Sequence, residues 1–396
     1  MLSCHKEPIP CDVPACNSDT IPAEDSMKLL WSSEINPEGN RSRADLYLQN
    51  DHLIINNNFN TPSANILYFD TISREIKWEW KERISDKFHT INYDEDYIYI
   101  KDGRELFSVD IQSGTTQWAF KDTVELASYG SLIDEYYYLG GFPKAAGNRS
   151  LSAFRRIHKN NGMDWEELIV FDRGDFDNFT IFFQSPNLWM HPNTNDSILI
   201  IPVRMVEFDR NLRRSDLIAY NLNTREILWQ VEDFTSIVSV DQPIIHNGHV
   251  FVKNTREIFA FNLMNGSLVW KHTETNQWAN YGGGRLQVID GKLVLGEISG
   301  SVVYALDPMT GNVIWRHEKD FGFATCKSDI VHYKNYIIIA NFDKLDVFDV
   351  RDGKHVYQVR NTVRRFRGRM ALDEANRKLY VPEESQIVAY ELPEEF

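Results

Sequence analysis

The sequence has no long apolar run and little positive charge. No stretch approaches the roughly 18–20 apolar residues that a membrane-spanning helix needs, so we predict no transmembrane helix. The chain of 396 residues carries 42 Lys and Arg against 57 Asp and Glu, a formal net charge of −15. Because a protein that binds nucleic acid needs a basic surface for the phosphates, this balance argues against nucleic acid as a partner.

Cysteines and catalytic motifs are also scarce. The sequence contains four cysteines, Cys4, Cys11, Cys16 and Cys326. It contains no G-x-S-x-G, H-E-x-x-H or phosphate-binding loop. His246 and His249 flank a tight turn that places them on different strands, and no cysteine or acidic residue stands nearby at ligand spacing. We therefore predict no catalytic residue, no metal site and no cofactor.

What the sequence does contain is a repeat. Residues 300–316, GSVVYALDPMTGNVIWR, are two apolar runs joined by a turn rich in Asp, Pro and Gly, a pattern typical of a β-hairpin. An Asp or Asn stands eight residues before an aromatic residue in six copies: Asp70 and Trp78, Asp110 and Trp118, Asn221 and Trp229, Asn262 and Trp270, Asp307 and Trp315, and Asp349 and Tyr357. In a degenerate third copy, Arg155 takes the turn position and Trp165 follows ten residues later.

The period of this repeat predicts the fold. The turn position recurs at 70, 110, 155, 221, 262, 307, 349 and 391, so the intervals are 40–45 residues with one of 66. This period, with strand-like patterns throughout, is typical of four-stranded propeller blades, whereas helical solenoids would show apolar residues at i, i+3 and i+4. The repeat tryptophans are then packing residues between neighbouring blades. We predict an all-β, eight-bladed β-propeller of four-stranded blades.

The two ends of the sequence indicate how the ring closes. The eighth copy has Glu391 at the turn position, but its tryptophan would fall at 399, beyond Phe396. Residues 27–31, MKLLW, resemble the outer strand of the other copies. We therefore expect this N-terminal strand to complete the last blade and to remove the edges of an open ring.

Residues 1–26 are expected to form a flexible tether, and residues 27–396 the propeller. Leu2-Ser3-Cys4 resembles the end of a bacterial lipoprotein signal peptide, although the apolar region that should precede it is missing and a chance match is the alternative. We predict lipidation at Cys4 and attachment to a membrane by this lipid alone. Cys11 and Cys16 either form a disulfide in an oxidising compartment or remain free thiols.

Propeller topology assigns the loops to two faces. Strands A to D of a blade run antiparallel from the channel outward, so the A–B and C–D turns lie on one face, which we call the short-turn face. The B–C loops and the D–A crossovers lie on the other, the loop-rich face. Long irregular segments concentrate there, including residues 140–144, 172–178, 207–215, 281–284 and 364–369. Because binding sites are usually built on variable loops of a rigid scaffold, we expect the loop-rich face to be the working face.

Two basic clusters supply candidate partner-binding residues. Arginine forks suit carboxylates, and the alternative is that these arginines pair with acidic residues of the chain itself. The candidates for contact with a protein partner are Phe142, Lys144, Arg210, Arg213, Arg214, Arg365, Arg367 and Arg369. A second hypothesis is a carbohydrate or small-ligand module at the channel mouth, with Trp189, Trp278 and Tyr281 as stacking surfaces.

The motifs ALDPMTGNVIW, AFNLMNGSLVW and SVDIQSGTTQW resemble the pyrroloquinoline-quinone-type propeller repeat, over nearly the whole chain after residue 26. One branch of that superfamily consists of eight-bladed quinoprotein dehydrogenases, which bind the quinone and calcium over the channel beneath a disulfide between adjacent cysteines. This chain has no adjacent cysteines and is much shorter than those enzymes. A quinone-dependent enzyme is therefore kept only as a remote alternative.

The other branch consists of outer-membrane assembly lipoproteins of the BamB type, which are eight-bladed, similar in size and tethered through a lipidated N-terminal cysteine. Resemblance to this branch implies a non-enzymatic, monomeric scaffold, anchored to the outer membrane of a bacterial envelope and binding a protein partner. The degenerate third copy and the long fourth interval depart from the regular pattern. No partner-contact residue is carried over from the family.

Overall fold

The computed structural model describes residues 27–35, 43–58, 65–82, 90–121, 126–146, 149–172, 180–207, 212–236, 242–254, 256–274, 285–296, 302–318, 330–341, 344–360, 365–366, 368–394 and 396. The predicted tether, with Cys4, Cys11 and Cys16, lies outside these ranges, as does Cys326. All named elements of the described residues are strands. No helix among them is long and apolar enough to cross a bilayer.

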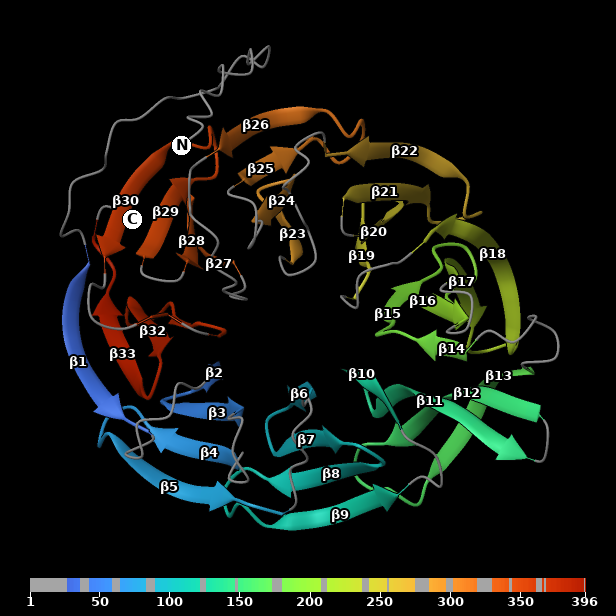
Figure 1. Cartoon of the computed structure of the whole chain (residues 1–396), viewed down its shortest axis with the longest axis horizontal. Helices are drawn as coiled ribbons and strands as arrows, with labels where there is room; N and C mark the ends of the chain where they lie inside the picture. The colour runs from blue at the N-terminus through green and yellow to red at the C-terminus, as the bar shows by residue number, and fades with distance from the viewer. Residues whose placement is uncertain are drawn as a thin grey trace, which may run out of the picture.

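Eight antiparallel sheets are arranged around a central channel, so the all-β, eight-bladed propeller is confirmed (Figure 1). Blades one and two contain β2 (Arg43–Gln49), β3 (His52–Asn58), β4 (Asn65–Asp70), β5 (Glu75–Trp80), β6 (Thr90–Tyr93), β7 (Tyr97–Asp102), β8 (Glu105–Asp110) and β9 (Thr116–Lys121). Blades three and four contain β10 (Leu126–Ile133), β11 (Tyr136–Ala146), β12 (Arg149–His158), β13 (Trp165–Asp172), β14 (Thr180–Phe183), β15 (Asn187–Met190), β16 (Ser197–Glu207), β17 (Leu212–Asn221) and β18 (Glu226–Thr235).

The remaining blades follow in chain order. Blades five and six contain β19 (Ile244–His246), β20 (His249–Lys253), β21 (Glu257–Asn262), β22 (Leu268–Thr273), β23 (Leu286–Ile289), β24 (Lys292–Gly296), β25 (Val302–Leu306) and β26 (Val313–Glu318). Blades seven and eight contain β27 (Val331–Tyr333), β28 (Tyr336–Asn341), β29 (Lys344–Asp349), β30 (His355–Arg360), β31 (Ala371–Asp373), β32 (Lys378–Glu383), β33 (Gln386–Glu391) and β1 (Lys28–Glu34).

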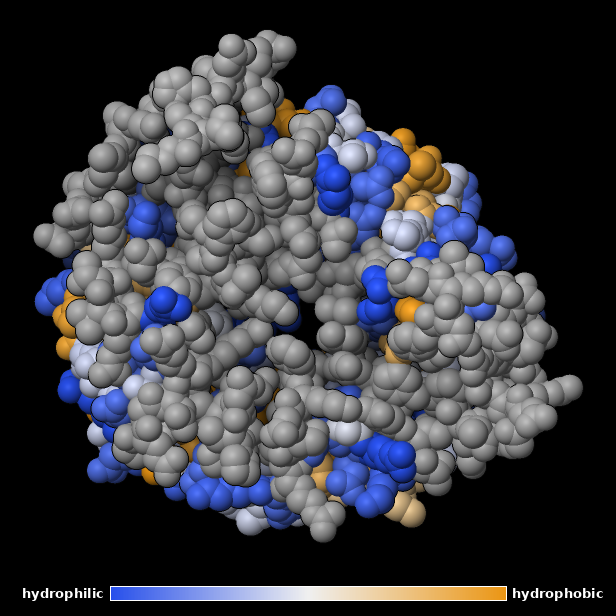
Figure 2. Space-filling model, viewed as in Figure 1, coloured by the Kyte–Doolittle hydropathy of each residue, from blue (hydrophilic) through white to orange (hydrophobic). Residues whose placement is uncertain are grey.

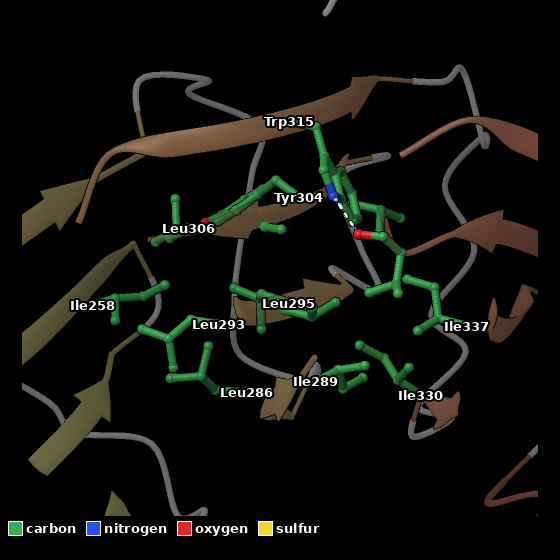
Figure 3. Packing of buried hydrophobic residues seen from close by; sticks show 14 of the residues in the cluster. Ile258, Leu286, Ile289, Leu293, Leu295, Tyr304, Leu306, Trp315, Ile330 and Ile337 are labelled. Carbon is green, nitrogen blue, oxygen red and sulfur yellow. Dashed lines mark hydrogen bonds between the residues drawn. The ribbon is translucent and has the colours of Figure 1, made fainter. Parts of the chain in front are cut away.

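The core lies between neighbouring blades. The middle strands of each sheet are covered on both faces by adjacent blades, so they read as continuous apolar runs; β25, VVYAL, is buried along its whole length. Figure 3 shows one such layer, in which Leu293, Leu295 and Tyr304 of blade six meet Ile258 of blade five and Ile337 of blade seven. The outer strands consist mostly of exposed and half-buried residues, as β18 and β22 show, because their outer side faces solvent.

The N-terminal strand closes the ring as predicted. β1 pairs antiparallel with β33, from Lys28 opposite Glu391 to Glu34 opposite Gln386, and the sheet order is β1-β33-β32-β31. Blade eight is therefore built from both ends of the described chain, and β33 is covered on both sides.

The repeat tryptophans connect consecutive blades. The indole N–H of Trp315 donates to the carbonyl of Val350 in the next blade at 2.9 Å (Figure 3). Gly353 lies against the indole, since an added Cβ would be 2.5 Å from a ring carbon. Four other junctions have an equivalent indole-to-carbonyl hydrogen bond of 2.8–3.1 Å and an equivalent glycine against the indole. The bonds are Trp78 to Ile111, Trp118 to Lys159, Trp229 to Leu263 and Trp270 to Pro308. The interpretation of these tryptophans as interblade packing residues is confirmed.

The turn residues serve local geometry, also as expected. Asp307 accepts hydrogen bonds from the backbone N–H groups of Met309 and Thr310 at 2.8 and 2.9 Å, and Asn221 makes the equivalent bonds in blade four. Asx turns of this kind hold the short C–D connections by hydrogen bonds within the turn itself.

The alignment of the third copy was wrong. Arg155 lies inside β12, opposite Glu167, and the turn position is His158 at the end of that strand. Trp118 bonds to the carbonyl of the next residue, Lys159, as the other tryptophans do in their own junctions. The error arose because no Asp or Asn marks this turn and because Trp165 follows it after seven residues instead of eight (165 − 158 = 7).

Candidate functional site

Blades three and four are taller than the other six. Their B and C strands, β11, β12, β16 and β17, have 10 or 11 residues, whereas those of the regular blades have five to seven. At about 3.3 Å per residue, four extra residues add roughly 13 Å of height. The extra length lies at the B–C ends, so the hairpins β11–β12 and β16–β17, which we call the tall hairpins, project on the loop-rich face.

Two segments predicted as loops are therefore strands. Residues 140–144 belong to β11, with a bulge between Gly141 and Lys144 in its pairing with β12. Of residues 207–215, Glu207 ends β16 and the segment from Leu212 onward belongs to β17. The glycine pair and the run of arginines resemble loop composition, but their pairing partners continue the ladder.

Gly140 has a packing role rather than the flexibility of a loop glycine. A Cβ atom at this position would lie 2.8 Å from Cβ of Phe183 and 3.2 Å from its carbonyl oxygen. The absence of a side chain lets β14 approach β11 closely, and these two strands join blade four to blade three. A larger residue would separate the tall hairpins.

The inner strand of blade four is divided in two. β14 pairs with the upper part of β16, from Val203 to Val206, and β15 pairs with the lower part, from Ser197 to Ile200. This fifth strand explains the long interval in the repeat. It also supports β16 along nearly its full length.

A buried carboxylate fixes the top of blade four. Asp216 is fully buried and accepts hydrogen bonds from Nε2 of Gln230 at 3.0 Å and from the backbone N–H of Asp233 at 2.9 Å. Burial raises the pKa of Asp216. Asp233 has a φ of 45° in the irregular part of the β17–β18 pairing. The carboxylate thus stabilises a bulge that a plain ladder would not contain.

The two neighbouring arginines of β17 differ in their surroundings. Arg214 lies with Nη2 3.6 Å from Oδ2 of Asp216 and Nε 3.1 Å from the sulfur of Met205, so part of its role is structural. Arg213, one residue earlier, is exposed. Among the predicted candidates, the tall hairpins bring Phe142 and Lys144 of β11 onto the blade beside Arg213 and Arg214, while Arg210 lies outside the described residues.

The second arginine cluster does not join the first. Arg369 precedes blade eight, across the ring from blade four (Figure 1). Its guanidinium lies 4.7 Å from the ring centroid of Tyr47, its N–H donates to Asp45, and its carbonyl accepts from the N–H of Leu46. The carbonyl of Arg365 accepts from the N–H of Glu384. Arg369 therefore connects blade eight to blade one, and Arg367 lies outside the described residues.

The stacking candidates are only partly placed. Trp189 lies on β15, an inner strand as expected, and packs partly buried against the apolar cluster between blades four and five. The ring of His191 is 5.1 Å from it. Trp278 and Tyr281 fall outside the described residues, so the proposed stacking platform is represented by Trp189 alone.

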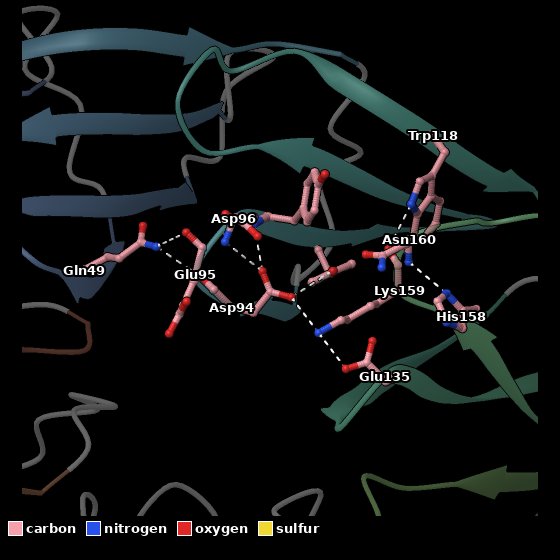
Figure 4. A network of polar contacts seen from close by, with 11 residues as sticks. Gln49, Asp94, Glu95, Asp96, Trp118, Glu135, His158, Lys159 and Asn160 are labelled. Atoms are coloured by element: carbon pink, nitrogen blue, oxygen red, sulfur yellow. Dashed lines mark hydrogen bonds and ion pairs between the residues drawn. The ribbon is translucent and has the colours of Figure 1, made fainter.

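The short-turn face carries a polar network that the sequence did not suggest. Nζ of Lys159 lies 3.2 Å from Glu135 and 3.7 Å from Asp94, and Gln49 donates to the carbonyls of Asp94 and Glu95 (Figure 4). The hydrogen bond to Glu135 raises the pKa of Lys159. These contacts connect the turns of blades one, two and three. Within the described residues, no group of three His, Cys, Asp or Glu side chains is arranged to hold a metal ion.

Comparison with known proteins confirms the predicted resemblance. Residues 212–392 match the family described as outer membrane protein assembly factor BamB. No curated protein sequence matches the chain.

Among solved structures, BamB from Moraxella catarrhalis has 11% identity and a TM-score of 0.57, covering 92% of this chain and 97% of that one. Quinohemoprotein alcohol dehydrogenase from Comamonas testosteroni has 10% identity and a TM-score of 0.63, covering 92% and 76%. The computationally designed Ika8 protein has 12% identity and a TM-score of 0.63, covering 90% and 99%. At these identities the likeness shows the propeller fold alone, because scaffold, enzyme and designed protein share it.

Proposed function

We propose that this chain is a non-enzymatic scaffold of the bacterial cell envelope, which binds a protein partner through its loop-rich face and takes part in outer-membrane protein assembly. The match of residues 212–392 to the assembly-factor family supports the role. The tall hairpins support the location, because they are the part of the described loop-rich face that departs from the regular ring. A projecting pair of hairpins on a rigid ring suits recognition of another protein.

The direction of β1 supports the proposed anchoring. Lys28 lies opposite Glu391, the C–D turn end of β33, so the chain enters the ring at the short-turn face. A lipid on Cys4 followed by a tether would then attach to this side of a monomeric ring. The tall hairpins would remain available on the opposite face.

The chemistry of Arg213 suggests what the partner offers. Its side chain is exposed beside the partly engaged Arg214, on a strand held by the buried Asp216. Guanidinium groups on a rigid strand can bind carboxylates or backbone carbonyls with little loss of side-chain freedom. We therefore expect a partner surface that contains acidic side chains.

Charge reversal on this strand tests the proposal. The full chain, carrying a lipoprotein signal, is captured from envelope membranes and its partners are quantified by mass spectrometry. We expect Arg213→Glu to lower the yield of a barrel-assembly protein at least about threefold, since like charges at an interface oppose association. The control is Arg104→Glu, an exposed arginine at the B–C turn of blade two on the same face.

Equal capture by Arg213→Glu and the unaltered chain would contradict the location, and capture without any envelope protein would contradict the role. In that second case, screening of carbohydrates with Trp189→Ala as the comparison tests the small-ligand alternative. The enzyme alternative is tested by adding pyrroloquinoline quinone and calcium and following dye-linked oxidation of alcohols. We expect no turnover.

A further inference from the structure

Every blade ends in an outer strand whose outward edge pairs with no other described strand. β5, β9, β13, β18, β22, β26, β30 and β1 each stand last in their sheets. Unpaired edge groups can accept another strand, and proteins usually protect such edges with charged side chains, with bulges or with covering segments. The composition of these strands therefore shows which edges are protected.

Protection differs between the two sides of the ring. The residue directly before the repeat tryptophan is Lys77 in blade one and Gln117 in blade two. In blade three the strand pairing places Glu166 at the tryptophan site, so the exposed Trp165 takes the equivalent position. In blades four, five and six the residue before the tryptophan is Leu228, Val269 and Ile314, all exposed. Ile227 and Leu268 precede the first two of these and are exposed as well. At this position, blades four to six thus present aliphatic side chains where blades one and two present polar ones, and of the pair that precedes the tryptophan only Ile76 is apolar and exposed in blade one.

The exposed apolar residues follow the outer wall of the ring from blade four to blade six. The bond from Trp229 to the carbonyl of Leu263 places the next residue, Met264, beside β18, and the bond from Trp270 to Pro308 places Met309 beside β22. Figure 2 shows hydrophobic side chains along the outer wall at β22. We call this surface the apolar rim, which consists of Ile227, Leu228, Met264, Leu268, Val269, Met309 and Ile314.

The charges around β18 favour a cationic occupant. Among the described residues, Glu226 and Glu232 are exposed at either end of the apolar part of β18 and no cation contacts them. The nearby cations already have carboxylate partners: Arg225 lies 2.7 Å from Glu166, and Lys271 lies 3.0 Å from Glu257. The edge of β18 is therefore apolar in the middle and negative at both ends.

We propose that β18 accepts an extended segment of a partner protein as an additional outer strand of blade four. The segment would be rich in β-branched residues and carry Lys or Arg at its ends. Backbone hydrogen bonds to the edge would supply the pairing, the apolar rim would cover the inserted side chains, and the two glutamates would set the position of its basic ends. This surface is separate from the loop-rich face and does not depend on the role proposed above.

The probe is a fluorescent peptide of about ten residues that alternates valine and threonine and has a lysine at each end. Binding to the full chain is followed by fluorescence anisotropy at two salt concentrations. We expect Leu228→Lys to weaken binding at least about fivefold, because it places a charge at the edge and repels the basic peptide. Gln117→Lys, at the equivalent position of blade two, should leave the affinity within about twofold.

Two further measurements decide the mode of binding. A peptide of the same composition with a central proline cannot continue a ladder, so it should bind at least about tenfold more weakly. Thermal unfolding of each variant shows whether the ring is intact. Equal binding by the Leu228→Lys variant, or by the proline peptide, would overturn the proposal. Light scattering that shows a dimer abolished by Leu228→Lys would overturn it too, since the occupant would then be a second copy.

Discussion

The five regular junctions and the junction between blades three and four are built differently. At a regular junction, one indole bonds to the next blade and lies on a glycine, as Trp315 does with Val350 and Gly353. At the junction of the tall blades, Arg225 with a φ of 63° takes the place of the glycine, and its guanidinium lies 2.7 Å from Glu166 of blade three. Trp165, which is 45% exposed, packs on Phe120 of blade two instead, with ring centroids 5.7 Å apart. A broad apolar layer and a bond from Ser152 to the carbonyl of Ile181 join the tall blades.

The difference shows that two blades can be joined either by one indole held in a fixed site or by a long apolar interface. An indole that fits one site leaves little freedom in strand length, because the whole turn must keep its register. The long apolar interface between blades three and four does not depend on a tryptophan–glycine site, so the strands there can be longer. Among the described residues, the strands that deviate most from the repeat are also the ones that extend furthest on the loop-rich face.

The largest effect on stability is expected from removing the indole of Trp315. Trp315 is only 1% exposed, so Trp315→Ala should lower the free energy of unfolding by about 3–5 kcal/mol. Trp165→Ala removes a ring that is 45% exposed and lies outside any tryptophan–glycine site, so it should lower this free energy by less than about 1 kcal/mol. Denaturant unfolding followed by circular dichroism measures both. Equal losses would mean that the tryptophan–glycine site is not what makes Trp315 important.

A glycine substitution tests the same contact from the opposite side. At Gly353, φ is 73° and an added Cβ would lie 2.5 Å from the ring of Trp315. Gly353→Ala should therefore cost about 2–3 kcal/mol through backbone strain and overpacking together. Gly103 has a similar φ of 54° with no atom within 4 Å of an added Cβ, so Gly103→Ala isolates the backbone cost of about 1 kcal/mol. Similar losses at the two sites would exclude the ring contact as the cause.

The smallest effects are changes of stability with pH, and they have opposite signs for Asp70 in a regular blade and Asp216 in a tall blade. The N–H of Ser73 and the ammonium of Lys77 hold the pKa of the turn residue Asp70 below its ordinary value. This carboxylate stabilises the fold above the ordinary pKa of an aspartate, and the contribution is lost as pH falls. Burial raises the pKa of Asp216, so its contribution is present at low pH and is lost as pH rises through the folded-state pKa.

Unfolding measured between about pH 3 and pH 6 separates the two groups. Asp70→Asn should reduce the loss of stability on acidification, whereas Asp216→Asn should make that loss steeper, because it removes a group that favours the fold at low pH. If stability changed with pH in the same way in both variants, burial would not determine how Asp216 contributes to the pH dependence of folding.

The sequence was sufficient for the ring but not for its tall part. Spacing between turn residues and aromatics predicted eight blades and the closing strand, because turn chemistry and interblade packing repeat in every copy. Residues 140–144 and 207–215 were interpreted as loops because glycines and clustered charges usually break strands. In the fold, Gly140 accommodates a neighbouring strand and Asp216 receives two hydrogen bonds, and both contacts join segments that no local pattern connects.

The apolar edges were visible in the sequence but could not be distinguished from core. Ile227-Leu228 and Leu268-Val269 fit the apolar periodicity of a strand, and periodicity alone does not say which side neighbouring blades cover. Only the assembled ring shows that these residues lie at a free edge. The same limit applies to Arg369, whose position over Tyr47 depends on blades eight and one being adjacent.

The pairing of β1 with β33 has a consequence for the order of events during synthesis. Lys28 and Glu391 are 363 residues apart, so β1 is synthesised long before the strand with which it pairs. Seven blades contain only strands close together in sequence, so each can form as it appears. The eighth cannot be completed before β33 has been synthesised, and β1 stays without its partner during that interval. The edge of β1 is therefore unpaired while the other seven blades form, which makes the interval before ring closure the period of greatest risk of misassembly.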